Sequence, residues 1–462
     1  MVGGSLLWFL VTALTGPDIL AAQTSVPAST SAPLTLPGLL DRVNRQHPVM
    51  AAARAQIRSA EGSRRTAAVL PNPMLGYQLE NVRLPGGDPV PMDREAMATA
   101  TIPLEFIYQR GSRVDKANAE VRAAEAEAQT IRQHLALEAT RSYYETALAQ
   151  VELSTALDLA GWLDSLVEYN RTRSKEGVSA EADLIRAQLE RDRAWAEVTM
   201  QEVKLAHARA KLAAFIGDSV DTISPASEPT VTVPDEPLPL PHSASSVMQP
   251  ASGRTPISEL LNKRPEIQAA RERLAAASSG VGVARSLLIR ELGAMVGLKR
   301  TAGTSSLMAG MSLPLPIFDQ NRGDIARARA ERDLAAAELA NTERTVGAEI
   351  RGALEGARLL SQRAQRLVGS GAGQPVRFLV RAAEARRISV GAYQEGAVPL
   401  LQVLDAARAW GEARVTFYGT LFAQHESIIA LFAAQGSDLF GAIPALSARP
   451  VSSGTGRGGE GQ

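Results

Sequence analysis

The sequence contains no cysteine among its 462 residues. This absence excludes disulfide scaffolds, iron–sulfur clusters, cysteine-based zinc sites, thiol catalysis and the lipidation of a cysteine. Histidine is scarce as well, and no two of the five histidines stand at a spacing typical of metal ligands. The remaining residues form no recognisable catalytic constellation. The sequence therefore predicts a protein that is not an enzyme and that holds neither a cofactor nor a resident metal.

An excess of charge of one sign is also lacking. Lys and Arg together number 49, as do Asp and Glu, so the net charge is 0. Because proteins that bind nucleic acids carry a basic excess, this balance argues against a nucleic-acid partner. Aromatic residues make up only 4% of the chain, while hydrophobic residues make up 45%. The composition is that of a globular protein whose core is built from aliphatic side chains and alanine.

Long apolar runs are missing beyond the N-terminus, since no later stretch reaches the roughly 18 residues of a membrane-spanning helix. The N-terminus has a shorter apolar run, over residues 5–14, and Ala21 and Ala22 follow it. This order is typical of a secretory signal peptide, which we predict over residues 1–22. Basic residues do not precede the run, because the first basic residue is Arg42. An ordinary apolar tail and a wrongly assigned start codon are the alternatives.

A proline-rich segment divides the chain into two similar halves. We interpret residues 218–256 as an extended linker, because prolines at this density exclude a helix interior. Landmarks on its N-terminal side recur on its C-terminal side in the same order, which predicts an internal duplication with repeats over residues 36–217 and 257–436. We expect the Gly- and Ser-rich tail over residues 441–462 to be disordered. The matched landmarks are Pro103-Leu104-Glu105-Phe106 with Pro314-Leu315-Pro316-Ile317-Phe318, and Gly177 and Asp183 with Gly396 and Gln402.

Each half begins with a predicted helix, over residues 37–70 and 257–289, and continues with two segments in which apolar and polar residues alternate. In the first of these segments Leu75 and Tyr77 face one way, whereas Gln78 faces the other. Alternation over about 9–11 residues matches the length of a strand that crosses a membrane. The sequence therefore predicts two pairs of membrane strands.

Long helical hairpins follow the strand pairs. The first helix is predicted over residues 111–174, a length of roughly 95 Å, and a second returns over residues 180–215. Apolar residues in the returning helix follow a heptad-like spacing, which indicates packing as a coiled coil. We interpret the glycine-rich residues 369–373 as a break in the second long helix, because they lack the Lys-Ser/Thr of a phosphate-binding loop.

Four strands from one chain would leave two unpaired edges, which a membrane does not tolerate, so the sheet must close with strands of other chains. Two chains would form an eight-stranded barrel filled by side chains, whereas three would form a twelve-stranded barrel with room for a pore. The predicted fold is thus mainly α-helical with a membrane β-barrel portion. Each chain contributes a duplicated unit of helix, β-hairpin and long helical hairpin to a trimeric α/β-barrel channel.

This plan resembles the TolC-like outer-membrane efflux proteins over residues 36–435. The resemblance implies a homotrimer in contact with outer-membrane lipid, with a helical tube in the periplasm. Such a protein is the passive exit duct of a tripartite efflux system and works with a periplasmic adaptor and an inner-membrane pump. Many relatives carry a lipidated N-terminal cysteine, which this chain lacks.

The expected cargo follows from a narrower resemblance. Residues 70–74, together with Glu80 and Asn81, are similar to the heavy-metal-cation branch of the family, which implies export of divalent metal cations. Drug efflux and type I secretion by a duct of the same fold remain alternatives. A periplasmic coiled-coil adaptor would have one hairpin between β-rich halves, and a soluble scaffold would need no strand pairs.

The resemblance also implies site residues at the turns of the long hairpins. The second turn motif places Gln402 and Asp405 at the pore constriction, on one face of a helix and with Asp405 in its first turn. The alternative for Asp405 is a solvated acid that favours the helix N-terminus. Asp183 and Tyr393 match positions that hold the gate closed by contacts between neighbouring hairpins. Val398 stands where the family has a basic residue, so a hydrogen bond is expected in place of a charged lock.

Overall fold

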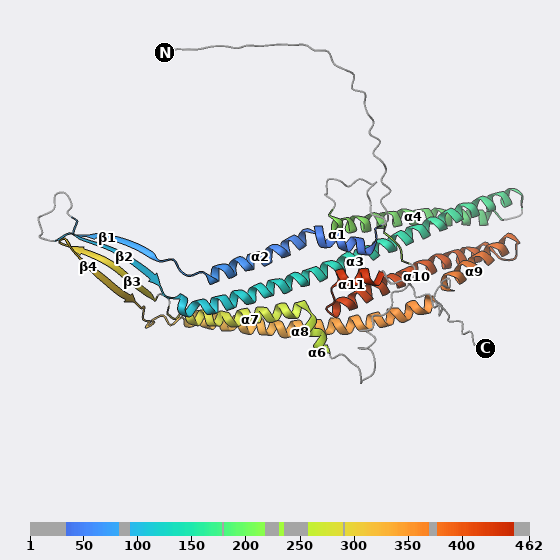
Figure 1. Cartoon of the computed structure of the whole chain (residues 1–462). Coiled ribbons are helices and arrows are strands. Elements are labelled where there is room, and N and C mark those ends of the chain that lie inside the picture. Colours follow the sequence, from blue (N-terminus) through green and yellow to red (C-terminus); the bar gives the residue numbers. More distant parts are fainter. Residues whose placement is uncertain are drawn as a thin grey trace, which may run out of the picture.

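The computed structural model describes residues 34–82, 93–177, 180–217, 231–234, 257–289, 292–368 and 377–447. The molecule is elongated, with the strands at one end and the turns of two helical hairpins at the other (Figure 1). The first half contains α1 (Leu36–Gln46), α2 (Pro48–Ala68), β1 (Met74–Glu80), β2 (Glu95–Pro103), α3 (Phe106–Lys175) and α4 (Glu181–Ile216). The second half contains α6 (Ile257–Lys263), α7 (Pro265–Ser286), β3 (Gly293–Thr301), β4 (Thr304–Ser312), α8 (Arg322–Val368), α9 (Arg377–Gln394), α10 (Leu400–Ala434) and α11 (Leu439–Ser447).

The strands form one antiparallel sheet in the order β1-β2-β3-β4. The pairing of β2 with β3 joins the two halves of the chain, and the register aligns Tyr77, Ala98, Leu298 and Leu307 across the sheet. Because neighbours in register share a face, one face is apolar except for Arg300 and Ser305, as the alternation predicted, and the other carries most of the polar side chains among glycines and methionines. The polar face includes Gln78, Glu80, Glu95, Thr99, Thr101, Lys299 and Ser306.

The first helix of each half is broken, where the sequence predicted a continuous one. His47 is extended (ψ 130°) between α1 and α2, and Arg264 is extended (ψ 126°) before α7. A proline follows each of them, and the ring of a proline disfavours helical geometry at the residue before it. Proline itself fits the first turn of the next helix. The prediction of unbroken helices over residues 37–70 and 257–289 was therefore wrong at these two positions.

The long hairpins span most of the molecule. The helix α3 has 70 residues, a length of roughly 105 Å, and extends beyond both predicted ends. Gly177 and Gly396 have positive φ (72° and 76°) where the two hairpins turn, a conformation that glycine adopts without steric cost. The helix α8 ends at Val368 and α9 begins at Arg377. The glycine-rich break predicted over residues 369–373 lies outside the described residues.

The main core lies midway along the molecule, where α1, α3, α4, α10 and α11 meet. Several of the chain's few aromatic residues pack in this core. The rings of Tyr144 and Phe422 stack with centroids 5.7 Å apart, and the Tyr144 hydroxyl lies 3.1 Å from His425 Nδ1. Burial raises the pKa of Tyr143 to about 12. Leu439 of α11 is fully buried in this core. The prediction of a disordered tail from residue 441 is thus wrong for residues 441–447, whereas residues 448–462 lie outside the described part.

Two other predicted segments also lie outside the described residues. They are the signal peptide over residues 1–22 and most of the proline-rich linker over residues 218–256. Within the linker, residues 231–234 are described, and Val231 pairs with Leu34 in a parallel bridge.

Arg264 ties the second half together. Its guanidinium contacts Glu266 at 2.9 Å, Glu349 of α8 at 3.1 Å and the carbonyl oxygen of Ala433 at 3.1 Å, while only 6% of the side chain is exposed. Arg264→Met should lower the stability by about 3–5 kcal/mol, because it removes the cation beside the enclosed Glu266, whose side chain is 16% exposed. The unfolding temperature in detergent measures this effect. Lys263→Met is the matched control, since its exposed pair with Glu259 contributes about 0.3–0.5 kcal/mol. Equal shifts in both variants would contradict the prediction.

Candidate functional site

The hairpin turns lie at the end of the molecule opposite the sheet (Figure 1). There, the first hairpin packs against the second through a cluster of buried side chains. This tip cluster comprises Ala160, Leu163, Leu166, Val167, Ala187, Ala194, Val198, Tyr393, Leu400, Val403 and Leu404. Val398 packs against it as well. At the position where the family resemblance placed a basic residue, the chain therefore makes an apolar contact.

Tyr393 is held within the tip cluster by a buried hydrogen bond. Its hydroxyl donates to Asn170 Oδ1 of α3 at 2.5 Å, and Asn170 Nδ2 donates to the carbonyl oxygen of Leu166 at 2.9 Å. The guanidinium of Arg173 lies 5.8 Å from the centre of the Tyr393 ring, within the range of a cation–π contact. The tip of the second hairpin is thus fixed to the first hairpin within one chain.

Asp183 acts on Tyr393 through its charge. It lies in the first turn of α4 and is half-buried. Burial raises the pKa of Tyr393; the hydrogen bond to Asn170 opposes this shift, and the negative charge of Asp183 adds to it. The structure therefore places both predicted gate residues in one electrostatic environment, while the hydroxyl of Tyr393 is directed at Asn170.

Gln402 and Asp405 lie on the face of α10 that is turned away from the tip cluster. Both are exposed, whereas Val403 and Leu404 between them are buried. Because α10 begins at Leu400, Asp405 is in the second turn of the helix and not in the first as expected. The side chain is 63% exposed, and its Oδ1 lies 3.7 Å from Arg408 Nη1. Its carboxylate is thus available to the space outside the chain, with one cation beside it.

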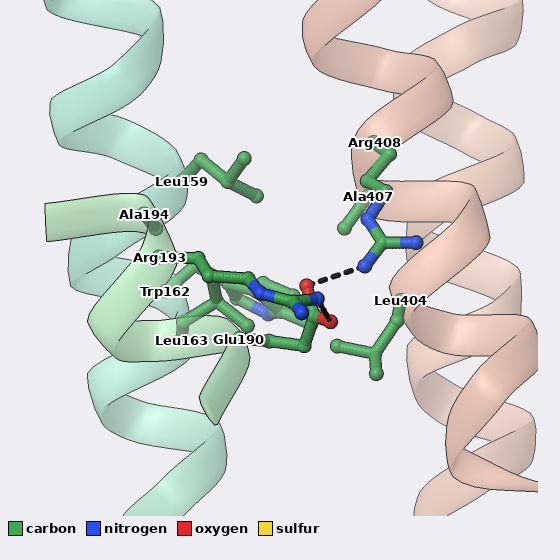
Figure 2. A pocket seen from close by; sticks show the side chains of 9 residues that line it. All are labelled: Leu159, Trp162, Leu163, Glu190, Arg193, Ala194, Leu404, Ala407 and Arg408. Carbon is green, nitrogen blue, oxygen red and sulfur yellow. Dashed lines mark hydrogen bonds and ion pairs between the residues drawn. The ribbon is translucent and has the colours of Figure 1, made fainter. Parts of the chain in front are cut away.

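A carboxylate bridges the two hairpins next to Asp405. Glu190 of α4 accepts hydrogen bonds from Arg408 of α10 and from Arg193 Nη1, the latter at 3.0 Å. Figure 2 shows Arg408 reaching across the space between α10 and α4 toward this carboxylate. A cavity of about 280 Å³ lies beside the bridge, lined by Trp162, Leu159, Leu163, Ala194, Leu404 and Ala407 together with the three charged residues.

The described residues contain no group of three or more histidine, aspartate or glutamate side chains that could hold a metal ion. Searched over the same residues, the helices include none that is long and apolar enough to cross a membrane.

Comparison with known sequences identifies the family of the chain. Residues 39–218 and 257–437 match the family described as outer membrane efflux protein. The chain belongs to this family. The efflux protein is therefore a protein of the outer membrane, and the periplasmic adaptor and the soluble scaffold are excluded as alternatives.

Two relatives align with nearly the whole efflux protein. The cobalt-zinc-cadmium resistance protein CzcC of Cupriavidus metallidurans is 26% identical over 429 residues, which cover 89% of this chain and 94% of CzcC. The pyoverdine export outer membrane protein OpmQ of Pseudomonas putida is 28% identical over 425 residues, which cover 85% of this chain and 83% of OpmQ. Among solved structures, CusC superimposes with a TM-score of 0.70 at 18% identity and covers 91% of this chain and 99% of CusC. The last likeness confirms the predicted fold.

Sequence reasoning missed three residues of the site in the efflux protein: Asn170, Glu190 and Arg408. An asparagine in the interior of a helix is unfavourable unless its side chain has a partner, so Asn170 carried a weak signal. The charged pair carried none, because Glu190 and Arg408 lie 218 positions apart in a chain with 49 acidic and 49 basic residues.

Tyr393→Phe in the efflux protein should loosen the contact between the hairpins. The change leaves the buried Asn170 Oδ1 without its donor, at a cost of about 1–3 kcal/mol. We expect larger and more frequent conductance steps in planar lipid bilayers. The matched control is Tyr169→Phe, because the Tyr169 hydroxyl makes only longer contacts: it donates to the carbonyl oxygen of Gln394 at 3.5 Å and accepts from Arg173 Nη1 at 3.3 Å. If the two variants conduct alike, the Tyr393 hydroxyl does not restrain the tip.

Proposed function

We propose that three copies of this chain close their sheets into one twelve-stranded barrel, three times the four strands of each chain. The observation that carries this proposal is the sheet itself. It has one apolar and one polar face, and β1 and β4 stand at its edges. Strands in a membrane cannot leave their edges unpaired, and a barrel of this size has room for a pore. The hairpins of the three chains would continue the barrel as a tube.

The proposed duct is passive and is not an enzyme. It is a homotrimer that works with a periplasmic adaptor and an inner-membrane pump, and the pump supplies the energy. Residues 1–22 are a signal peptide for export, and residues 36–217 and 257–436 are two repeats of one unit. A chain that must expose an apolar sheet face to lipid and a polar face to a channel fits this role.

The proposed cargo is a divalent metal cation. The alignment with CzcC, a cobalt-zinc-cadmium resistance protein, spans 94% of that relative and agrees with the resemblance of residues 70–74. A duct must release its cargo, so weak sites suit transport better than a tight site would. Export of an organic molecule is the second candidate, which the similarity to the pyoverdine exporter OpmQ favours.

At the hairpin tips we propose a constriction formed by Asp405 and Gln402 of the three chains. Both side chains are exposed on the face of α10 that is turned away from the chain's own core. Three carboxylates around a narrow axis attract cations and repel anions. Asp183 and Tyr393 would hold the closed state by contacts with a neighbouring hairpin, in addition to the bond between Tyr393 and Asn170.

Deletion of the gene tests the cargo. We expect the deleted strain to lose resistance to zinc, cobalt, nickel or cadmium, with growth restored by the gene on a plasmid. Minimal inhibitory concentrations of these metals and of common antibiotics in the two strains are the measurement. Sensitivity confined to antibiotics, with metal resistance unchanged, would favour the organic cargo and refute the metal proposal.

A further inference from the structure

Glu190 is the most enclosed member of the charged group beside Asp405. Its side chain is 15% exposed, against 47% for Arg408, 63% for Asp405 and 65% for Arg193. An enclosed carboxylate depends on its cations, because it has lost most of its contact with water. The hydrogen bonds from Arg408 and Arg193 lower the pKa of Glu190 against the opposing effect of its burial, so the carboxylate remains charged.

Arg408 stands among three acids, Glu190, Asp405 and Glu412, and is hydrogen-bonded to Glu190. Nη2 donates to Glu190, whereas the pair with Asp405 is longer, at 3.7 Å between Nη1 and Oδ1. The hydrogen bond that Arg408 donates to Glu190 also raises the pKa of Arg408. The guanidinium is therefore directed at the hairpin interface, and Asp405 keeps only a loose contact with it.

The charges of the four side chains cancel: Arg193 and Arg408 are positive, and Glu190 and Asp405 are negative. Without the charge of Glu190, the group would carry +1 in each chain. We propose that Glu190 sets the ion selectivity of the duct by holding Arg408 back from Asp405, which makes it a positioning residue for the constriction. The inference rests on the proposed role of Asp405 at the pore.

A neutral Glu190 would no longer hold the Arg408 guanidinium at the hairpin interface. The cavity of about 280 Å³ beside the bridge adjoins both Glu190 and Arg408 (Figure 2). Arg408 follows Asp405 by three positions on α10, a spacing at which side chains on a helix meet. A released guanidinium would therefore pair with Asp405 and cancel its negative charge at the axis.

The test compares two substitutions that break the same ion pair. Glu190→Gln should lower the cation-to-anion permeability ratio by roughly tenfold, the change that ~1.4 kcal/mol produces, because it frees Arg408. Arg408→Gln should raise the ratio, because it removes the cation beside Asp405. The purified full-length protein in planar lipid bilayers under a salt gradient gives the ratio from the reversal potential. Glu197→Gln, one heptad farther along α4 and hydrogen-bonded to Gln201, is the matched control.

The directions in which Glu190→Gln and Arg408→Gln change the permeability ratio show whether the ion pair acts through its charges or only holds the hairpins together. If the bridge only holds the hairpins together, Glu190→Gln and Arg408→Gln move the permeability ratio alike or leave it unchanged, and the inference is overturned. Misfolding from the broken bridge would affect both variants, and size-exclusion chromatography in detergent detects it. Asp405→Ala tests the pore role of Asp405 separately from the positioning role of Glu190. If this variant leaves the permeability ratio unchanged, Asp405 does not line the pore.

Discussion

Leu307→Lys is expected to prevent the stable insertion of the protein into the outer membrane. Leu307 lies next to the central residue of β4, on the apolar face of the sheet, and is 74% exposed in the single chain. A lysine on the lipid-facing side of a membrane strand costs about 2–4 kcal/mol at mid-depth. Three copies in a trimer would raise this cost to about 6–12 kcal/mol, which equals the stability of many folded proteins.

The neighbouring residue provides a control at the same depth. Met308→Lys introduces the same charge one position farther along β4, on the polar face opposite Gly297. Because that face is directed at the lumen in the proposed barrel, the variant should insert and assemble. Membrane fractionation and the mass of the extracted protein in detergent measure both effects. Normal yields of a trimeric Leu307→Lys protein, or equal losses for both variants, would show that the apolar face does not meet lipid.

Much of this architecture follows from local patterns in the sequence. Alternation at Leu75, Tyr77 and Gln78 is enough to predict strands, because each residue's face depends only on its position along the strand. Heptad spacing in residues 180–215 predicts a helix with a packed stripe in the same way. The breaks at His47 and Arg264 were also readable, since a proline follows each of them.

The contacts of the candidate site depend on tertiary packing. Tyr393 meets Asn170 across 223 positions, and nothing in either local sequence specifies the other. The helix α11 was missed because the composition of the tail hid a helical signal, Leu439 and Ile443 at a spacing of four residues, both buried. Residue type and spacing thus predict which face of a helix or strand is buried. Which distant residues that face contacts depends on the tertiary fold.

Asp405→Ala is expected to reduce the cation selectivity of the duct by tenfold or more. Three carboxylates around one axis form a ring of negative potential, and unit charges about 4 Å apart interact by ~4 kcal/mol near a protein surface. The substitution removes this ring, while Arg408 stays hydrogen-bonded to Glu190 at the hairpin interface. Block of the current by multivalent cations should weaken together with selectivity, because such ions would bridge the carboxylates. Gln402→Asp, which adds a second acid on the same face of α10, should strengthen both effects.

Glu412→Ala distinguishes a constriction from a general surface charge. Glu412 is exposed and lies one heptad after Asp405 on α10. The substitution therefore removes a negative charge from the same face of the helix, about 10 Å farther from the tip. If the duct narrows at Asp405, the Glu412 variant should retain most of the selectivity and the block by multivalent cations, because a wider section lets water and salt screen the charge. Equal effects of the two substitutions would place the selective region elsewhere. If neither has an effect, Asp405 is a solvated acid near the helix start.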